Sequence, residues 1–199
     1  MIEAVLFDPR FHELLVGIDR EIADAERRRG CVCGGPLHRA DYLRKPRGLA
    51  PGVATAHTRF SFCCAHEGCR RRVTPPSLRL LGRRSYLATV VVLASALKQG
   101  PSARRAKMLR ERLGVGLRTL ARWQSWWHEV FPRTIFWRFE RAGFVPPCDA
   151  SRLPDSLMRS FNGPPLVKLL YTLLFLRPLT DPELMRVVRN PQKLSVLRV

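Results

Sequence analysis

Acidic residues are scarce in this chain. Sixteen aspartates and glutamates stand against 35 lysines and arginines in 199 residues, so the formal net charge is +19 and the isoelectric point is about 11.2. Only four acidic residues lie beyond residue 148, too few for a carboxylate-rich nuclease fold that holds metal ions. A positive surplus of this size favours polyanionic partners, nucleic acid first and an anionic membrane second.

Lysine is rare as well. Five of the basic residues are lysine and the other thirty are arginine. The planar guanidinium group matches phosphates and guanine edges better than the point charge of lysine does. A genome rich in arginine codons explains part of this bias, but it does not explain the net imbalance of charge.

The sequence also lacks an apolar run long enough to span a bilayer. The longest, residues 86–97 and 166–176, are too short, and the second contains Lys168. The first residues lack the basic start and long apolar core of a secretory signal. We therefore expect a cytoplasmic, nucleoid-associated protein without membrane contact. A hydrophobic content of 46% argues against wholesale disorder.

The positive charge is concentrated in the middle of the chain. Residues 1–30 carry a net charge of −2, residues 31–80 carry +7, residues 81–148 carry +10 and residues 149–199 carry +4. The electrostatic contact surface is therefore expected between residues 31 and 148.

Cysteine, in contrast, is plentiful and clustered. Five of the six cysteines fall in two groups, Cys31-Val-Cys33-Gly-Gly and Cys63-Cys64-Ala-His-Glu-Gly-Cys69. In a reducing compartment such clustering argues for a metal before it argues for disulfides. Structural zinc needs four soft ligands in a tetrahedron, which two short knuckles supply. We predict Zn²⁺ held by Cys31, Cys33, Cys64 and Cys69, with the glycines of both knuckles allowing the backbone to turn around the ion.

Other assignments remain open at this point. Cys63 is an alternative to Cys64, since adjacent residues of a strand point to opposite faces. His38 or His66 is an alternative to a weak ligand, and a set of buried free cysteines is the alternative without metal. The alternation of residues 59–64 predicts a strand that enters the second knuckle, with Phe60 and Phe62 on one face. A strand entering a metal knuckle is typical of a zinc ribbon.

Basic residues flank the cysteines. Arg44, Lys45 and Arg47 lie between the two knuckles, and Arg70, Arg71 and Arg72 follow the last one. We predict that these six side chains contact phosphates. A solvated run of charge is the competing interpretation.

Beyond residue 76 the pattern becomes helical. Residues 86–97 predict an apolar helix, and a second helix capped by Ser102 carries Arg104, Arg105 and Lys107 on its outer face. Gly114 is suited to a left-handed turn. A third helix is predicted from Leu117 to Phe131, with a buried stripe made of Leu120, Trp123, Trp127 and Val130.

Three helices with a short turn before the last predict a helix-turn-helix, in which the third helix lies in the major groove. Arg118, Thr119 and Arg122 lie opposite the buried stripe and are the candidates for reading base edges, with Ser125 one turn deeper. A plain helical hairpin is the alternative. The tryptophans at helical spacing predict a core more than a base-stacking surface, although Trp126 lies off the stripe.

Both ends of the chain are predicted to be helical. Residues 9–28 form an acidic amphipathic pattern that either packs on the zinc module or binds a basic partner, with one apolar face made of Phe11, Leu14, Leu15, Ile18 and Ile22. Residues 155–161 and 165–176 also look helical, and the latter is apolar enough to be buried in the fold or in a partner.

The combined motifs resemble a known family. Cys31-x-Cys33-Gly-Gly, the run 44–48, Phe62-Cys-Cys64, Cys69-Arg-Arg-Arg72 and Thr74-Pro-Pro76 resemble the zinc-ribbon/helix-turn-helix DNA-binding proteins of bacterial insertion sequences. The resemblance covers roughly residues 30–130. It implies zinc at the knuckle cysteines and DNA contact by the third helix.

We therefore expect an α+β, mostly α protein: a small zinc-ribbon-like β module, a three-helix helix-turn-helix module and C-terminal helices. The expected segments are an N-terminal amphipathic helix (1–29), the zinc module (30–80), the helix-turn-helix module (81–145) and a C-terminal helical segment (146–199). The expected function is that of a DNA-binding accessory or targeting protein of a mobile element, without enzymatic activity. Its expected partners are double-stranded DNA and, through the C-terminal apolar helix, a transposase or other protein. A free-standing transcription regulator and an RNA- or ribosome-binding protein are the alternatives.

Overall fold

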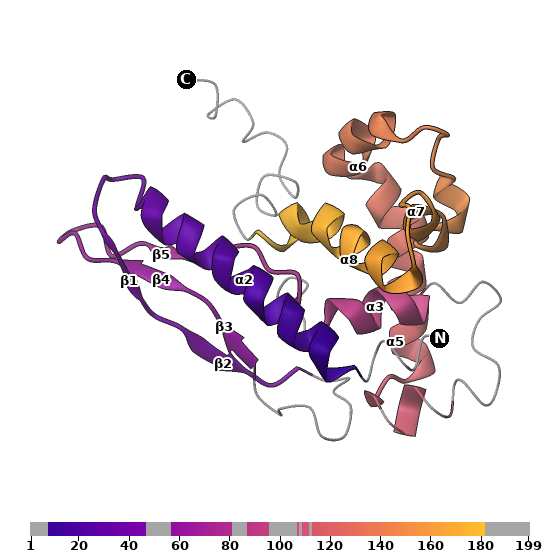
Figure 1. Cartoon of the computed structure of the whole chain (residues 1–199), viewed down its shortest axis with the longest axis horizontal. Coiled ribbons are helices and arrows are strands. Elements are labelled where there is room, and N and C mark those ends of the chain that lie inside the picture. The colour runs from indigo at the N-terminus through magenta and orange to yellow at the C-terminus, as the bar shows by residue number, and fades with distance from the viewer. Residues whose placement is uncertain are drawn as a thin grey trace.

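A long helix, two small antiparallel sheets and a group of shorter helices make up the described part of the chain (Figure 1). The computed structural model describes residues 8–46, 57–80, 87–95, 107, 109–111 and 113–181. The expected mostly helical α+β class with a small antiparallel sheet module is confirmed for these residues.

The first helix of the described residues, α2 (Pro9–Arg29), has the local signals of a stable helix. The Asp8 side chain accepts a hydrogen bond from the Arg10 N–H at 2.9 Å, and Pro9 occupies the first turn, where its missing N–H costs nothing. Three arginines in the last turn interact favourably with the helix dipole, and Gly30 at φ 80° ends the helix. The helix predicted over residues 9–28 is confirmed.

The buried face of α2 differs in part from the prediction. Phe11 and Leu15 are buried and Ile18 and Ile22 pack against the core, but Leu14 is 45% exposed. Asp19 takes a buried position instead, with 1% of its surface exposed. The apolar stripe is therefore interrupted by a carboxylate whose partners come from later in the chain.

The strands form one interrupted hairpin with a short extra strand. Their bounds are β1 (Leu37–Arg39), β2 (Tyr42–Arg44), β3 (His57–Arg59), β4 (Phe62–Cys64) and β5 (Arg72–Val73). β1 pairs with β4, β4 with β5 and β2 with β3, all antiparallel. Between the two sheets the Ser61 carbonyl accepts from the Ala40 N–H, and the Ser61 N–H donates to the Asp41 carboxylate. The predicted single strand over 59–64 is therefore broken at residues 60–61, although Phe60 and Phe62 are both buried as expected.

The helical part follows the hairpin. Its elements are α3 (Ala88–Ser95), α5 (Leu117–Ser125), the π-helix η1 (Trp126–Val130), the 3₁₀-helix η2 (Phe131–Arg133), α6 (Ile135–Glu140), η3 (Arg141–Gly143), η4 (Ala150–Arg152), α7 (Asp155–Arg159), α8 (Pro165–Leu176) and η5 (Arg177–Thr180). Every residue of α3 is buried, and residues 107, 109–111 and 113 are helical. Gly114 has φ 60°, so the left-handed turn predicted there is confirmed.

The third predicted helix has a change of register that the sequence did not reveal. Leu120, Trp123 and Trp127 are buried as expected, but Val130 is 50% exposed and Phe131 is fully buried. The π-turn explains the shift, because the Phe131 N–H bonds to the carbonyl of Trp126, five residues back. The extra residue in this turn moves Val130 outward and Phe131 into the core.

The buried apolar residues form two clusters. The larger one contains Phe11 and Leu15 of α2 together with α3, α5 and α8, and the smaller one contains Ala23 of α2, Leu37, Phe60 and Phe62 with two of the cysteines. α2 runs along the hairpin from the helical part to the cysteine turns, so it takes part in both clusters (Figure 1).

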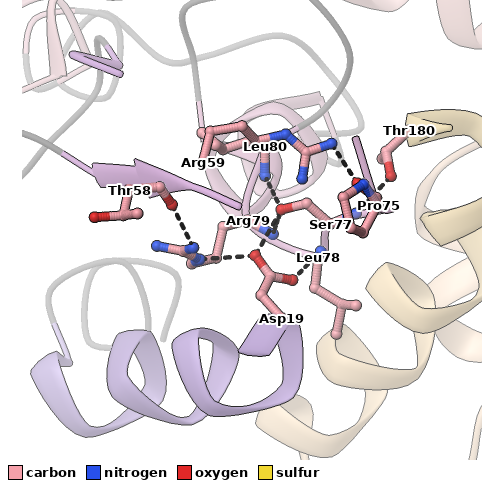
Figure 2. Close-up of polar contacts among 9 residues, drawn as sticks. All are labelled: Asp19, Thr58, Arg59, Pro75, Ser77, Leu78, Arg79, Leu80 and Thr180. Atoms are coloured by element: carbon pink, nitrogen blue, oxygen red, sulfur yellow. Dashed lines mark hydrogen bonds and ion pairs between the residues drawn. The ribbon is translucent and has the colours of Figure 1, made fainter. Parts of the chain in front are cut away.

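A buried polar network also connects the hairpin to the helices (Figure 2). The Asp19 carboxylate accepts from Ser77 Oγ at 2.6 Å, from the Leu78 N–H at 2.6 Å and from Arg79 Nε at 2.8 Å. Arg79 also donates to the Thr58 carbonyl on β3, and the Ser77 N–H donates to Thr180 Oγ1 in η5. One carboxylate therefore connects α2, the segment after β5 and, through its partners, β3 and the C-terminal helices.

Among the described helices, none combines the length and apolar character needed to cross a bilayer.

Candidate metal centre

Four cysteine side chains converge where the two turns of the sheet module meet. The sulfur atoms of Cys31, Cys33, Cys64 and Cys69 all lie within 4.8 Å of one another. Cys31 Sγ and Cys69 Sγ are 3.8 Å apart, and Cys33 Sγ and Cys64 Sγ are 3.4 Å apart. These separations exclude disulfides, whose sulfurs lie about 2.0 Å apart. They match a tetrahedral shell, in which a metal–sulfur distance of about 2.3 Å places the sulfurs about 3.8 Å apart.

The first turn positions Cys31 and Cys33 through its backbone. The Gly34 N–H donates to the Cys31 carbonyl at 2.8 Å, and the Cys31 N–H donates to the Gly35 carbonyl at 3.0 Å. Gly34 has φ 81°, a conformation that favours glycine. The two glycines therefore close a tight loop that turns both thiols toward the second knuckle.

Gly35 also leaves space for the sulfur atoms. A methyl group on its Cα would meet Cys64 Sγ and His66 Cβ at 2.8 Å and Cys33 Sγ at 3.3 Å. No other residue type fits this contact without displacing a sulfur. The backbone is therefore shaped around the four sulfurs, as a metal site requires.

The second turn supplies Cys64 and Cys69 from either side of an exposed loop. Cys64 ends β4 and is completely buried, with its N–H bonded to the Arg71 carbonyl. The Cys69 N–H donates to the His66 carbonyl, and Gly68 has φ 83°. The predicted use of glycine in both knuckles is confirmed.

Backbone amides point at the sulfur atoms. The His66 N–H donates to Cys64 Sγ at 3.4 Å, and the backbone of Gly35 and Arg71 forms hydrogen bonds with the thiols of Cys33 and Cys69 respectively. Each of these amides lies two residues after its cysteine. Such bonds stabilise thiolates in metal knuckles and orient their lone pairs.

The four thiols differ in how easily they lose a proton. The Gly35 hydrogen bond holds the pKa of Cys33 down to about 6, whereas burial raises the pKa of Cys64 to about 12. The pKa of Cys69 is also raised, because the neighbouring cysteines and burial outweigh its bond to Arg71. Several thiolates this close repel one another, and a divalent cation removes that penalty by taking all of them as ligands. The donor set and geometry therefore fit a soft or borderline metal ion.

The alternative metal ligands that the sequence left open lie outside the group of four sulfurs. Cys63 lies half-buried with its Sγ 3.6 Å from the Arg70 carbonyl, outside the sulfur cluster. His38 and His66 are exposed and do not belong to the group. The expectation that Cys31, Cys33, Cys64 and Cys69 converge is confirmed. The sixth cysteine, Cys148, packs against the larger apolar cluster near Ser156.

No family model, curated protein or solved structure matches this chain.

The basic residues predicted to contact phosphates lie around the sheet module. Arg70, Arg71 and Arg72 follow the last cysteine and are exposed, Lys45 is exposed and Arg44 is half-buried. Arg47 lies outside the described residues. Arg70 has φ 43°, which is uncommon for a residue with a side chain and marks a tight turn after the cysteine cluster.

The residues predicted to read DNA lie on α5. Arg118 and Arg122 are exposed and Thr119 is half-buried, with Arg122 Nη2 donating to Thr119 Oγ1 at 3.3 Å. Lys107 is exposed and lies 4.0 Å from Glu111. Arg104 and Arg105 lie outside the described residues. The side chain of Ser125 is bonded to Glu129 at 2.8 Å.

Trp123 and Trp127 belong to the core, as predicted. Trp123, Trp127 and Trp137 are buried, and Trp126 is half-buried with its ring edge-on to Trp127 at 4.8 Å. The rings of Trp126, Trp127 and Trp137 all contact the buried ring of Phe131.

Two residues in the surroundings were not identified from sequence. No local sequence pattern indicates that Asp19 is buried, because its partner Arg79 lies sixty residues later in the chain. Tyr42 is the second. Its ring lies under two guanidinium groups, and the alternation of Tyr42 and Arg44 on one strand face was the only signal available.

Proposed function

We propose that this chain is a zinc-containing DNA-binding protein in which α5 reads base edges in the major groove. The observation that supports this most strongly is that α5 has one buried and one exposed face. Leu120 and Trp123 are buried at 3% and 4% exposure, whereas Arg118 and Arg122 are exposed in its first turns. An arginine fork at the start of an exposed helix suits recognition of guanine O6 and N7.

The approach to α5 supports this assignment. The preceding helical residues end at Gly114 in the left-handed conformation, and α5 begins three residues later, after Gly116. A short turn of this kind fixes the angle between two helices, as in a helix-turn-helix. The exposure of Leu117, 65%, leaves the opening of α5 uncovered by the rest of the described chain.

The metal centre has a structural role in this proposal. Four sulfur ligands complete a zinc shell and leave no open position for water or substrate, so the ion supplies folding energy rather than chemistry. The cysteines brace a hairpin that carries Arg44, Lys45, Arg70, Arg71 and Arg72. We assign these residues to phosphate contacts, which position the protein on the duplex without reading its sequence.

The biological setting proposed is a mobile genetic element. It rests on the resemblance of residues 30–130 to the zinc-ribbon/helix-turn-helix proteins of insertion sequences. The chain would act there as an accessory or targeting protein. A transposase or another protein would bind the outer side of α8, where Tyr171 is 48% exposed, because the opposite side, with Leu169 and Leu173, is buried in the larger cluster.

The function is tested by selecting bound duplexes from a random pool and then measuring variants on the selected sequence. Arg118→Ala and Arg122→Ala should each cost about 1–3 kcal/mol on the selected duplex and relax discrimination at one position. Arg133→Ala, at an exposed arginine in η2, is the matched control and should leave discrimination intact.

Four outcomes would contradict the proposal. Equal weakening on selected and random duplexes would show that α5 is not the reader. Tighter binding to structured RNA in competition would favour an RNA- or ribosome-binding protein. A single defined promoter footprint would favour a free-standing regulator over a mobile-element protein, and metal-dependent nicking of supercoiled DNA would place the chain among enzymes.

A further inference from the structure

Two arginines from different strands converge on one tyrosine ring. The Arg44 Cζ lies over the Tyr42 ring at 5.6 Å from its centroid, and the Arg72 Cζ lies over the same ring at 5.5 Å. Arg44 is two residues further along β2, whereas Arg72 belongs to β5, which follows the last cysteine turn. The cysteine knuckle therefore brings together a contact that the sequence separates by thirty residues.

A third arginine adds to the positive charge of this place. Arg59 on β3 is directly opposite Tyr42 in the sheet register. Its guanidinium group is buried and donates to the Pro75 carbonyl at 2.6 Å. Burial lowers the pKa of Arg59, and Arg44 lies close enough to lower it further. The side chain of Arg59 is therefore buried, whereas Arg44 is half-buried and Arg72 is exposed.

The positive charge of Arg44 and Arg72 has no acidic counterpart in the described part of the chain. Neither side chain forms an ion pair with a carboxylate there. The acidic residue adjacent to Tyr42 in sequence, Asp41, accepts a hydrogen bond from the Ser61 N–H. Two unpaired guanidinium groups over the same ring repel each other, and a bound anion relieves that repulsion.

The ring determines how these arginines are presented. A guanidinium group resting on an aromatic face is held by its flat side, so its N–H donors, which lie in its plane, stay available at the edges. Holding the group in this way removes part of the rotamer entropy that binding would otherwise cost. Parallel N–H donors held in place match phosphate oxygens in a bidentate manner.

We infer that Tyr42, Arg44 and Arg72 form a phosphate clamp on the hairpin, in which Tyr42 is a positioning residue that holds two guanidinium groups ready for the backbone of duplex DNA. The inference rests on the proposed function and deepens it, since it assigns a role in ionic binding to an uncharged side chain. The expected occupant follows from the charge of the clamp, its fork geometry and the +19 charge of the chain.

The test measures affinity for a random-sequence duplex and for the selected duplex over a range of salt. Tyr42→Leu should weaken binding to both duplexes by about tenfold, because two arginine side chains must then be ordered on binding. The salt slope should stay at the wild-type value, because no charge is removed and the same arginines still contact phosphates. Tyr42→Phe keeps the ring and should bind like the wild type.

Leu43→Ala is the matched control, since Leu43 is the next residue of β2, is 69% exposed and lies on the opposite face of the strand. It should change neither affinity nor slope. Metal content and thermal unfolding of each variant separate a binding effect from a folding effect. Arg72→Ala changes an exposed side chain and tests the clamp independently of the ring, with an expected decrease in slope of about one unit.

Several results would overturn the phosphate clamp. Wild-type affinity for Tyr42→Leu, an unchanged slope for Arg72→Ala, or a Tyr42→Phe variant as weak as Tyr42→Leu would overturn the clamp. A Tyr42→Leu effect confined to single-stranded DNA or RNA would overturn its assignment to duplex DNA. These outcomes are distinct from failure of the proposed function, in which the wild-type protein binds no duplex or Arg118→Ala leaves discrimination unchanged.

Discussion

At the scale of single residues, the cysteine cluster assigns a different role to each thiol. Cys64 is fully buried at the centre, Cys33 is exposed with a lowered pKa of about 6, and Cys63 lies against a backbone carbonyl outside the cluster. Adjacent cysteines on a strand point to opposite faces, so the sequence predicts that only one of Cys63 and Cys64 takes part. The structure selects Cys64 because the inner face of β4 faces the first knuckle.

Cys64→Ser should therefore lose its metal and Cys63→Ser should retain it. Removing one sulfur from a closed shell should forfeit most of the metal's contribution to folding, which in structural zinc sites amounts to about 10 kcal/mol or more. Elemental analysis of the two purified variants, with thermal unfolding, measures both effects. Equal metal content in the two would refute the ligand assignment.

Gly35 provides a test that changes no sulfur atom. Gly35→Ala should weaken metal binding, because the added methyl would meet Cys64 Sγ and His66 Cβ at 2.8 Å. Gly17→Ala is the control: a methyl group on its Cα would meet no atom within 4 Å, and α2 should gain about 0.5–1 kcal/mol from it. Competition with a chelator compares the metal affinities of the two variants, and wild-type affinity for Gly35→Ala would show that the site is not shaped around the sulfurs.

His57 is expected to make stability depend on pH. Burial, with the nearby charges of Arg79 and His12, lowers its pKa below the ordinary 6.5, and its Nε2 is buried without a partner. The unfolded chain therefore binds a proton that the folded chain excludes, so stability is complete above pH 6.5 and falls as the pH drops from there toward the lower folded value.

Unfolding of His57→Gln should depend less on pH than that of the wild type in this interval. Protonation of the cysteines would act in the same direction, so both proteins are compared with metal bound and metal content is checked at each pH. Identical pH profiles for the two would mean that His57 has no such role.

At the scale of elements, the periodic segments were the predictable part. Helices predicted over 9–28, 155–161 and 165–176 correspond to α2, α7 and α8, since their apolar residues recur with helical spacing and their ends carry proline or glycine. The exceptions are non-local. Val130 faces outward because of a π-turn, and Asp19 replaces Leu14 in the buried face because Ser77 and Arg79 reach it from another segment.

The contact between α2 and the segment after β5 should be a major source of stability. Asp19→Ala would leave Arg79 as a buried, unpaired charge, with Ser77 and the Leu78 N–H also deprived of their acceptor (Figure 2). Breaking such a buried pair costs about 3–5 kcal/mol. Asp24→Ala removes an exposed pair with Arg39 from the same helix and should cost at most about 1 kcal/mol. Denaturant unfolding of both metal-bound variants checks the difference, and equal losses would contradict it.

At the scale of the whole molecule, two apolar clusters share one helix. The smaller cluster includes Cys31 and Cys64, whereas the larger one contains none of the four clustered cysteines. We therefore expect the smaller cluster to depend on a bound metal. Metal removal should therefore melt residues 31–75 first and leave the helices between residues 87 and 131 partly intact. The positively charged hairpin should therefore unfold on metal removal while α5 stays folded.

The most direct test of the proposed function measures zinc content and duplex binding on the same preparation, before and after chelation. We predict about one zinc per chain as purified. Chelation should weaken binding to random and selected duplexes alike and reduce the salt slope, because the phosphate contacts of the hairpin are lost. Reconstitution with zinc should restore both. Less than half an equivalent of zinc, with full thermal stability and undiminished duplex binding, would contradict the account.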